Sequence, residues 1–264
     1  MTELLVRGNR VFAANGGVDF APSRPAVVLV HGAGMDHSVW ALQSRGLAHS
    51  GRSVLAVDLP GHGRSEGAAL TSIAALADWL AEFIAAAGLD TAVVAGHSMG
   101  ALAALELGAR HPERVRSLVL VGAAASMPVH PDLIAAAAED LTAAVAMIIA
   151  WGFSPVAALG GNPSPGLWLS GGGKRLLERS HPGVLYAALS ACNAYGEGES
   201  AAAGIRCPAL VVAGGADRMS PAKAGRALAD LIPGGKVELL EGAGHMLMAE
   251  RPQQVLRALM SLER

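Results

Sequence analysis

The chain has 264 residues, and a composition of 52% hydrophobic and 16% charged residues indicates a globular protein with a large buried core, which excludes an intrinsically disordered chain. A formal net charge of −2 without a basic run excludes nucleic acid and anionic membrane as expected partners. Two cysteines, Cys192 and Cys207, exclude a disulfide framework, and with no secretory-type apolar stretch we expect a reduced, cytoplasmic protein.

Short apolar runs typical of buried strands alternate with runs of helical composition along most of the chain. The expected strands cover residues 4–6, 10–14, 26–30, 53–57, 92–95, 115–121, 209–213 and 236–240. The expected helices cover residues 37–49, 72–87, 99–110, 132–150, 175–179, 183–195, 221–231 and 252–262. This order predicts an α/β fold with a mostly parallel sheet of about eight strands, helices on both faces and right-handed crossovers. Functional sites in such sheets lie beyond the carboxyl ends of the strands.

The alternation stops at residue 122 and resumes near residue 204. We therefore expect a core made of residues 1–121 and 204–264, with residues 122–203 as a mostly helical insertion. The longest apolar stretch of that insertion, Leu133 to Trp151, carries Glu139 and Asp140 near its middle. Two carboxylates at this depth are costly in lipid, so the stretch is predicted to be a helix of a water-soluble protein.

Gly96-His97-Ser98-Met99-Gly100 joins an expected strand to an expected helix. Glycines on either side of Ser98 permit a turn tight enough to push the serine hydroxyl clear of the sheet, where it can act as a nucleophile. Because the chain has 33 glycines, about 0.3 Gly-x-Ser-x-Gly matches are expected by chance, so the pattern alone is weak evidence. A second match is Gly63-Arg64-Ser65-Glu66-Gly67. Because Ser65 is separated from the preceding strand, it is predicted to be a loop residue.

A serine nucleophile needs a base, and the base needs a carboxylate to orient it. His245 follows the last expected strand, and Asp217 follows the strand before it. The order serine, aspartate, histidine is the order that this type of nucleophile turn uses. Asp58, also at a strand end, is a rival for the acid, although it is also suited to holding its own loop by hydrogen bonds. Asp217 alone could equally be a cap for the helix that begins near Pro221.

These motifs, together with His31-Gly32 and the run from Asp58 to Ser65, resemble the α/β-hydrolase superfamily, and in particular its serine esterases and haloperoxidase-like hydrolases with a helical cap after the sixth strand. The resemblance implies Ser98, Asp217 and His245 as a catalytic triad. It also implies an oxyanion hole from the backbone amides of Ala33 and Met99, with Gly34 or Met35 as alternative second donors. Some relatives place the acid after the sixth strand, where this chain has Gly122 and three alanines.

The resemblance implies a serine hydrolase that cleaves carboxylic esters of small to medium apolar substrates through an acyl-enzyme. Alternatives are a perhydrolase or haloperoxidase, an enol-lactonase or a carbon–carbon bond hydrolase with the same triad, or a slow-turnover ligand-binding receptor. The candidate substrate-binding residues are Gly34, Trp151, Phe153, Trp168 and Met246. No dinucleotide fingerprint or paired-histidine metal motif is present, so we expect no cofactor and no metal. The expected partner is a small-molecule ester, and the sequence does not indicate an oligomeric state.

Overall fold

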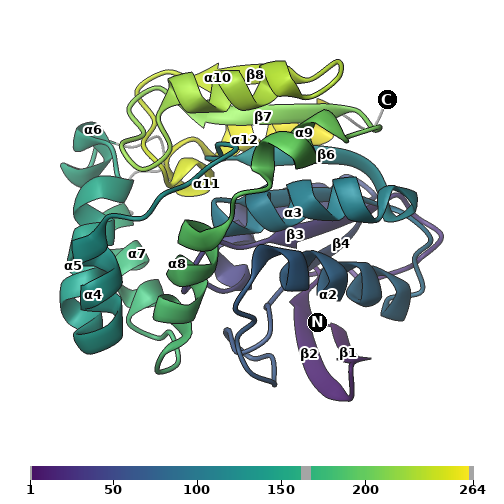
Figure 1. Cartoon of the computed structure of the whole chain (residues 1–264). Helices are drawn as coiled ribbons and strands as arrows, with labels where there is room; N and C mark the ends of the chain where they lie inside the picture. The colour runs from purple at the N-terminus through teal and green to yellow at the C-terminus, as the bar shows by residue number, and fades with distance from the viewer. Residues whose placement is uncertain (1, 162–167, 262–264) are drawn as a thin grey trace.

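A computed structural model describes residues 2–161 and 168–261 and places a single sheet at the centre of the chain (Figure 1). In space the eight strands follow the order β1-β2-β4-β3-β5-β6-β7-β8. Their bounds are β1 Thr2–Val6, β2 Asn9–Ala14, β3 Ala26–Val30, β4 Ser53–Val57, β5 Ala92–His97, β6 Val115–Val121, β7 Ala209–Gly214 and β8 Lys236–Leu240. The predicted fold class and strand positions are confirmed.

The first two strands form an antiparallel hairpin, β2 pairs antiparallel with β4, and all later neighbours pair in parallel. Every residue of β3, β4 and β5 is buried. Alternate side chains enter different clusters, so that Val28 packs on one face of the sheet while Val27 and Leu29 pack on the other. Burial on both faces explains why these strands are uninterrupted apolar runs.

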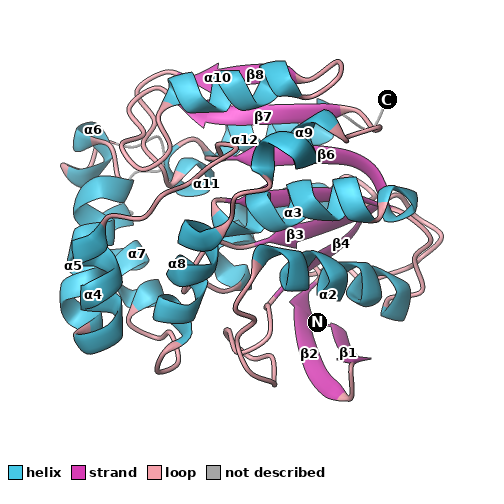
Figure 2. Ribbon diagram, in the orientation of Figure 1, coloured by secondary structure: helices cyan, strands magenta, loops and turns pink. Residues whose placement is uncertain are grey.

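Two layers of helices cover the sheet (Figures 1 and 2). One layer consists of α2 (Ile73–Ala86), α3 (Met99–Arg110), α9 (Gly198–Ala203) and α10 (Ala222–Leu231), and the other of α1 (Ala41–His49), α11 (Leu247–Glu250) and α12 (Pro252–Ser261). Short 3-10 turns occupy His37–Trp40 and Pro112–Arg114. The predicted start of α2 is confirmed, because the Ser72 hydroxyl accepts a hydrogen bond from the Ala75 amide at 3.2 Å. No helix within the described residues combines the length and apolar character required to span a bilayer.

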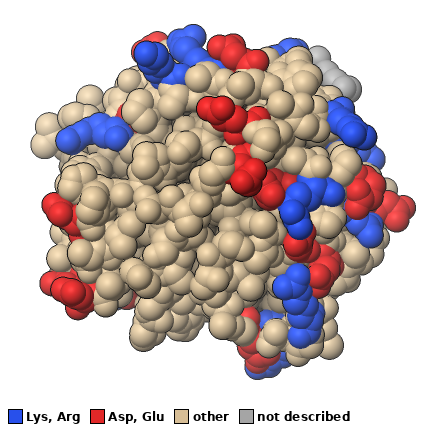
Figure 3. Space-filling view, viewed as in Figure 1, with Lys and Arg blue, Asp and Glu red and all other residues tan. Residues whose placement is uncertain are grey.

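Five of the six helices that the structure describes between β6 and β7 lie beyond the carboxyl ends of the strands, toward the left of Figure 1, and we call them the cap (described residues 131–161 and 168–194). They are α4 (Pro131–Glu139), α5 (Leu141–Gly152), α6 (Pro155–Ala158), α7 (Leu169–Leu177) and α8 (Val184–Ala194). Their apolar side chains form a separate cluster that also includes Met35 and Met246 from core loops. On the face drawn in Figure 3, charged side chains gather over the core helices, and most of the area toward the cap is uncharged.

Two sequence expectations within the cap are wrong. The single helix predicted over 132–150 breaks at Asp140, whose side chain accepts from the Ala143 amide at 3.1 Å and so starts α5 as a new helix. The helix predicted over 175–179 begins earlier, at Leu169, and includes Gly171, Gly172 and Gly173. Tertiary packing explains the glycine at 173, because a Cβ there would lie 2.9 Å from the Phe153 ring.

Candidate active site

Ser98 lies in the sharp turn between β5 and α3. Its backbone has φ 54° and ψ −118°, and among the described residues only Arg7 is another non-glycine with positive φ. Glycine is required on both sides of the serine because the backbone is so crowded: a Cβ on Gly96 would lie 2.0 Å from the Gly100 oxygen, and a Cβ on Gly100 would lie 2.5 Å from the Val30 oxygen. The turn is therefore strained by the surrounding backbone, as expected for a serine presented above a sheet.

Asp217 and His245 lie on the loops that follow β7 and β8, and both are almost fully buried. The His245 Nδ1 lies 2.8 Å from one carboxylate oxygen of Asp217. The other carboxylate oxygen accepts from the amides of Met219 and Ser220, each at 2.8 Å. These backbone donors stabilise the ionised carboxylate, which makes Nδ1 the protonated nitrogen of His245. Nε2 then carries a lone pair, and His245 lines the same cavity as Ser98.

The backbone of His245 is itself held from two directions. Its amide donates to the Gly152 oxygen of the cap at 2.8 Å, and its carbonyl accepts from the His97 Nε2 at 3.0 Å. His97 directly precedes the nucleophile and is fully buried, and burial together with the nearby His245 ring lowers its pKa well below the ordinary histidine value. His97 is therefore neutral and links the turn at Ser98 to the loop that carries His245. Sequence reasoning did not single out His97, although its place inside the glycine-serine motif was a usable signal.

The backbone amides of Ala33 and Met99 are the predicted oxyanion donors. Met99 is the first residue of α3, so its amide has no acceptor within the helix and sits at the positive end of the helix dipole. Neither amide has a hydrogen-bond partner among the residues that the structure describes. Ala33 lines the cavity beside Ser98.

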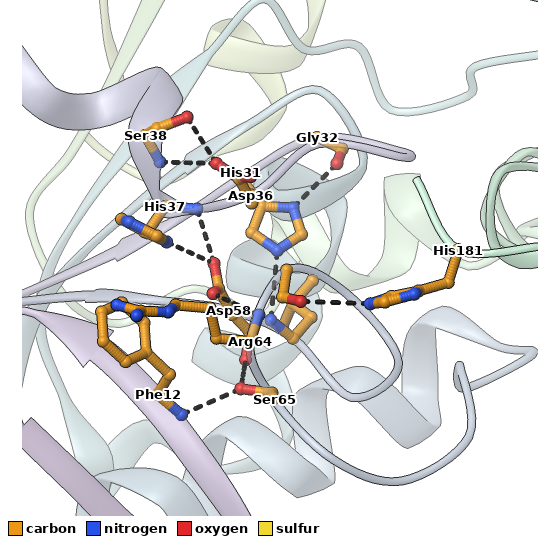
Figure 4. Close-up of polar contacts among 12 residues, drawn as sticks. Phe12, His31, Gly32, Asp36, His37, Ser38, Asp58, Arg64, Ser65 and His181 are labelled. Carbon is orange, nitrogen blue, oxygen red and sulfur yellow. Dashed lines mark hydrogen bonds and ion pairs between the residues drawn. The ribbon is translucent and has the colours of Figure 1, made fainter. Parts of the chain in front are cut away.

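His31 holds the Gly32 carbonyl, as Figure 4 shows, and the Gly32 carbonyl belongs to the same peptide unit as the Ala33 amide. The His31 Nε2 accepts from the Leu59 amide at 3.1 Å, so Nδ1 is protonated and donates to the Gly32 oxygen at 2.9 Å. The Gly32 oxygen also accepts from the Met35 amide at 3.2 Å. In a planar trans peptide the N–H points opposite to the C=O, so two donors on the Gly32 carbonyl turn the Ala33 N–H the other way. Burial lowers the pKa of His31 to about 3, which keeps this tautomer neutral.

Asp58 and Ser65 form hydrogen bonds that hold the loop after β4. One oxygen of Asp58 accepts from the amide and the Nδ1 of His37, at 2.6 and 2.9 Å, and the other accepts from the Arg64 amide at 2.9 Å. The Ser65 hydroxyl donates to the Asp58 carbonyl at 2.6 Å and accepts from the Phe12 amide at 3.0 Å (Figure 4). Both side chains are thus occupied with loop structure.

Asp36, His37 and Asp58 are the one group of potential metal ligands found among the described residues, with ligand atoms within 4.8 Å of one another. Their atoms are already engaged by protein donors. The Asp36 carboxylate accepts from the amide of Ser38 at 2.9 Å, and the Asp58 oxygens are occupied as above. The donor set is that of a hydrogen-bonded loop, and it leaves no converging set of free oxygens for a cation.

A cavity of about 270 Å³ lies between the triad and the cap. Its wall consists of Ala33, Ser98, Met127, Pro128, Val129, His130, Leu133, Trp151, Leu189, Cys192, Arg218, Met219 and His245. Most of these side chains are apolar, and Arg218 is the one Lys, Arg, Asp or Glu among these lining residues. Burial raises the pKa of Cys192 to about 12, so its thiol stays protonated and does not compete with the serine.

Of the five predicted substrate-binding residues, the structure places only Trp151 on the cavity wall. Phe153 and Met246 are buried in the apolar cluster of the cap. Trp168 is 72% exposed, and Gly34 faces the Leu185 side chain of α8, which an added Cβ would approach to 2.8 Å. Sequence hydrophobicity does not distinguish an aromatic side chain that packs the cap from one that faces the cavity.

Sequence reasoning missed the extended segment from Met127 to His130, together with Leu189, Cys192 and Met219. Met219 had a usable signal, since it lies two residues after the predicted acid. The segment from Met127 to His130 follows the sixth strand, whose carboxyl end was already expected to border the site.

The sequence profile described as the alpha/beta hydrolase family matches residues 27–258. The chain belongs to the alpha/beta hydrolase family. A pimeloyl-[acyl-carrier protein] methyl ester esterase of Chromobacterium violaceum is 31% identical over 241 residues, covering 89% of this chain and 92% of that protein. A putative carbamate hydrolase of Caulobacter sp. is 31% identical over 248 residues, covering 88% of each chain. Among solved structures, the enol-lactonase from Burkholderia xenovorans superimposes with a TM-score of 0.86 at 24% identity, covering 99% of both chains.

Proposed function

We propose that this α/β hydrolase cleaves carboxylic esters through an acyl-enzyme formed on Ser98. The observation that carries the proposal is the arrangement around one cavity. Ser98 and His245 share its wall, and the buried carboxylate of Asp217 lies 2.8 Å from Nδ1 of His245. A serine, a neutral imidazole with a bare Nε2 and an orienting carboxylate are the components of nucleophilic acyl transfer.

In this mechanism Nε2 of His245 accepts the proton of the Ser98 hydroxyl as its oxygen attacks the ester carbonyl. The negative charge that develops on the carbonyl oxygen is stabilised by the amides of Ala33 and Met99. His245 then gives its proton to the departing alcohol, which leaves Ser98 acylated. Water then attacks the acyl carbonyl as it loses a proton to His245, and His245 returns that proton to the Ser98 oxygen as the acid departs. Asp217 stays ionised throughout and stabilises the imidazolium.

The cavity supports a small to medium, largely apolar substrate. Its volume of about 270 Å³ lies just below the range of about 300–1,000 Å³ that is common for ligand sites. Side chains such as Leu133, Trp151 and Leu189 favour an apolar acyl or alkoxy group. Arg218 at the wall disfavours a cationic group.

The test is a pre-steady-state measurement with p-nitrophenyl acetate and butyrate. An acyl-enzyme predicts a burst of p-nitrophenol that equals the concentration of active sites, followed by steady turnover. Mass spectrometry after treatment with a fluorophosphonate should place the adduct on the peptide that contains Ser98. No burst and no adduct would contradict the proposal, and a stoichiometric burst without further turnover would indicate a binding receptor.

The relatives named as an enol-lactonase and a putative carbamate hydrolase make lactones and carbamates the informative competitors. The same serine can attack the carbonyl of either class. Comparing kcat/KM across esters of graded acyl length, lactones, carbamates and β-diketones therefore identifies the preferred class, because fold and triad do not determine it. A preference of more than about 100-fold for another class would replace ester cleavage as the main activity.

A further inference from the structure

Glu250, the last residue of α11, is fully buried, five positions after His245. Its carboxylate accepts from the Gly244 amide at 3.1 Å and from the Ser154 amide at 3.3 and 3.4 Å. Within the part of the chain that the structure describes, backbone amides are the partners of this carboxylate. A buried carboxylate is costly unless its acceptors are satisfied, and here they are satisfied by one amide from the histidine loop and one from the cap.

A second set of hydrogen bonds joins the same two segments. The Gly152 oxygen, at the end of α5, accepts from the amides of His245 and Met246 at 2.8 and 3.1 Å. Gly244 lies where these bonds converge. A Cβ on Gly244 would lie 2.5 Å from the Ser154 nitrogen, 2.7 Å from a Glu250 oxygen and 2.8 Å from the Gly152 oxygen.

We propose that Glu250 is a positioning residue that ties the His245 loop to the end of helix α5 of the cap. Through Glu250, the catalytic base and residues 152–154 form one rigid unit. Cap motion that admits substrate consequently takes place in other cap segments and does not pivot at residues 152–154. This inference rests on the proposed function, since it assigns His245 the role of base.

The decisive variant is Glu250→Gln, which preserves volume but replaces one acceptor oxygen by an NH₂ group. One oxygen of Glu250 accepts from both amides, whereas the other accepts from Ser154 alone. An NH₂ group in the second position cannot accept and faces the Ser154 N–H, so the connection to the cap is weakened. We expect kcat for p-nitrophenyl butyrate to fall about 10- to 100-fold with KM changed less than about two-fold, because only the alignment of the base with the serine is disturbed. Fluorophosphonate labelling of Ser98 should slow by a similar factor.

Glu106→Gln is the matched control. Glu106 is another buried carboxylate, on α3, where it accepts from the Tyr195 hydroxyl at 2.7 Å, outside the histidine loop. Both variants should lower the melting temperature, but only the Glu250 variant should lower kcat. Glu250→Asp, which keeps the charge and shortens the reach, should retain more kcat than the glutamine variant and provides the measurement if Glu250→Gln does not fold.

The inference is overturned if a folded Glu250 variant keeps kcat and labelling rate within about two-fold of the parent while losing stability as Glu106→Gln does. It is equally overturned if Glu106→Gln loses the same kcat. Failure of the proposed function would look different, since the parent protein itself would then give neither an ester burst nor a Ser98 adduct.

Discussion

The sheet half of the molecule and the cap contribute different things to the site. The sheet half carries the predicted chemical groups on loops that follow β5, β7 and β8, of which β5 and β7 are fully buried. Its clusters contain large side chains such as Trp40 and Phe83 with no exposure. The cap has a smaller apolar cluster and leaves Leu159 90% and Trp168 72% exposed. Segments with less burial open at lower free energy, so the cap is suited to substrate entry and selection, whereas the sheet half keeps the geometry of the reacting groups constant.

The sharpest test of this division is Ser98→Ala. Removing the nucleophile should leave the fold intact and reduce turnover by about 10⁶-fold, with a residual rate from binding and the oxyanion donors. Ser65→Ala is the control, because Ser65 matches the same sequence pattern but bonds within its loop. Steady-state kinetics on purified, folded variants checks it. Near-normal activity of Ser98→Ala would mean that Ser98 is not the nucleophile and that the proposed division between sheet half and cap is wrong.

Replacing the partners of the serine should have the next largest effect. Asp217→Asn and His245→Ala are each expected to lower kcat by about 10³- to 10⁴-fold or more, and the double variant should be little worse than His245→Ala, since the pair acts as a unit. Asp58→Asn is the control, measured on folded protein by circular dichroism and kinetics. If Asp58→Asn abolished activity and Asp217→Asn did not, the acid would be Asp58.

Acid should destabilise the sheet half through His31. Its folded-state pKa of about 3 lies below the unfolded value of about 6.5, so the neutral form is favoured by folding. This contribution is fully present above pH 6.5 and is lost progressively as pH falls from 6.5 toward 3, amounting to about 2 kcal/mol between pH 7.5 and 5. Urea unfolding at pH 7.5 and pH 5 should show a lower free energy of unfolding at pH 5. In His31→Gln this decrease should be smaller by about 2 kcal/mol than in the parent protein. An equal pH dependence in both proteins would contradict the assignment.

The smallest effects on activity should come from substitutions in the cap, and they should differ between Trp151 and Trp168. Trp151→Ala removes a cavity wall and should change the ratio of kcat/KM for short and long acyl esters by about 10-fold. Trp168→Ala is the matched comparison, because this ring is 72% exposed and does not line the cavity. We expect it to leave the ratio unchanged. A larger effect from Trp168 than from Trp151 would mean that the cap closes differently around substrate.

The local sequence pattern was sufficient to predict a feature wherever that feature depends on residues that are close together in the chain. The strands β3 to β7 are apolar runs because both faces of the sheet are covered, and the helix start at Ser72 follows from its hydroxyl. The candidate triad was visible because Ser98, Asp217 and His245 each follow a strand of a parallel sheet, whose carboxyl ends meet at one edge. The break at Asp140 was missed because an N-cap and a mid-helix aspartate look alike in an apolar run.

By itself the sequence determined the α/β class and the positions of the strands along the chain, and it placed Ser98, Asp217 and His245 after strands of one sheet as a candidate triad. Tertiary structure alone decided which cap residues face the cavity, since Trp151, Phe153 and Trp168 are chemically similar but lie on the wall, in the cap cluster and in solvent. It also decided that Glu250 bonds the histidine loop to the cap and that His31 turns the Ala33 amide. The physical reason is that these roles depend on backbone amides and cavity walls brought together from distant segments, and periodicity reports only which side of a helix or strand is buried.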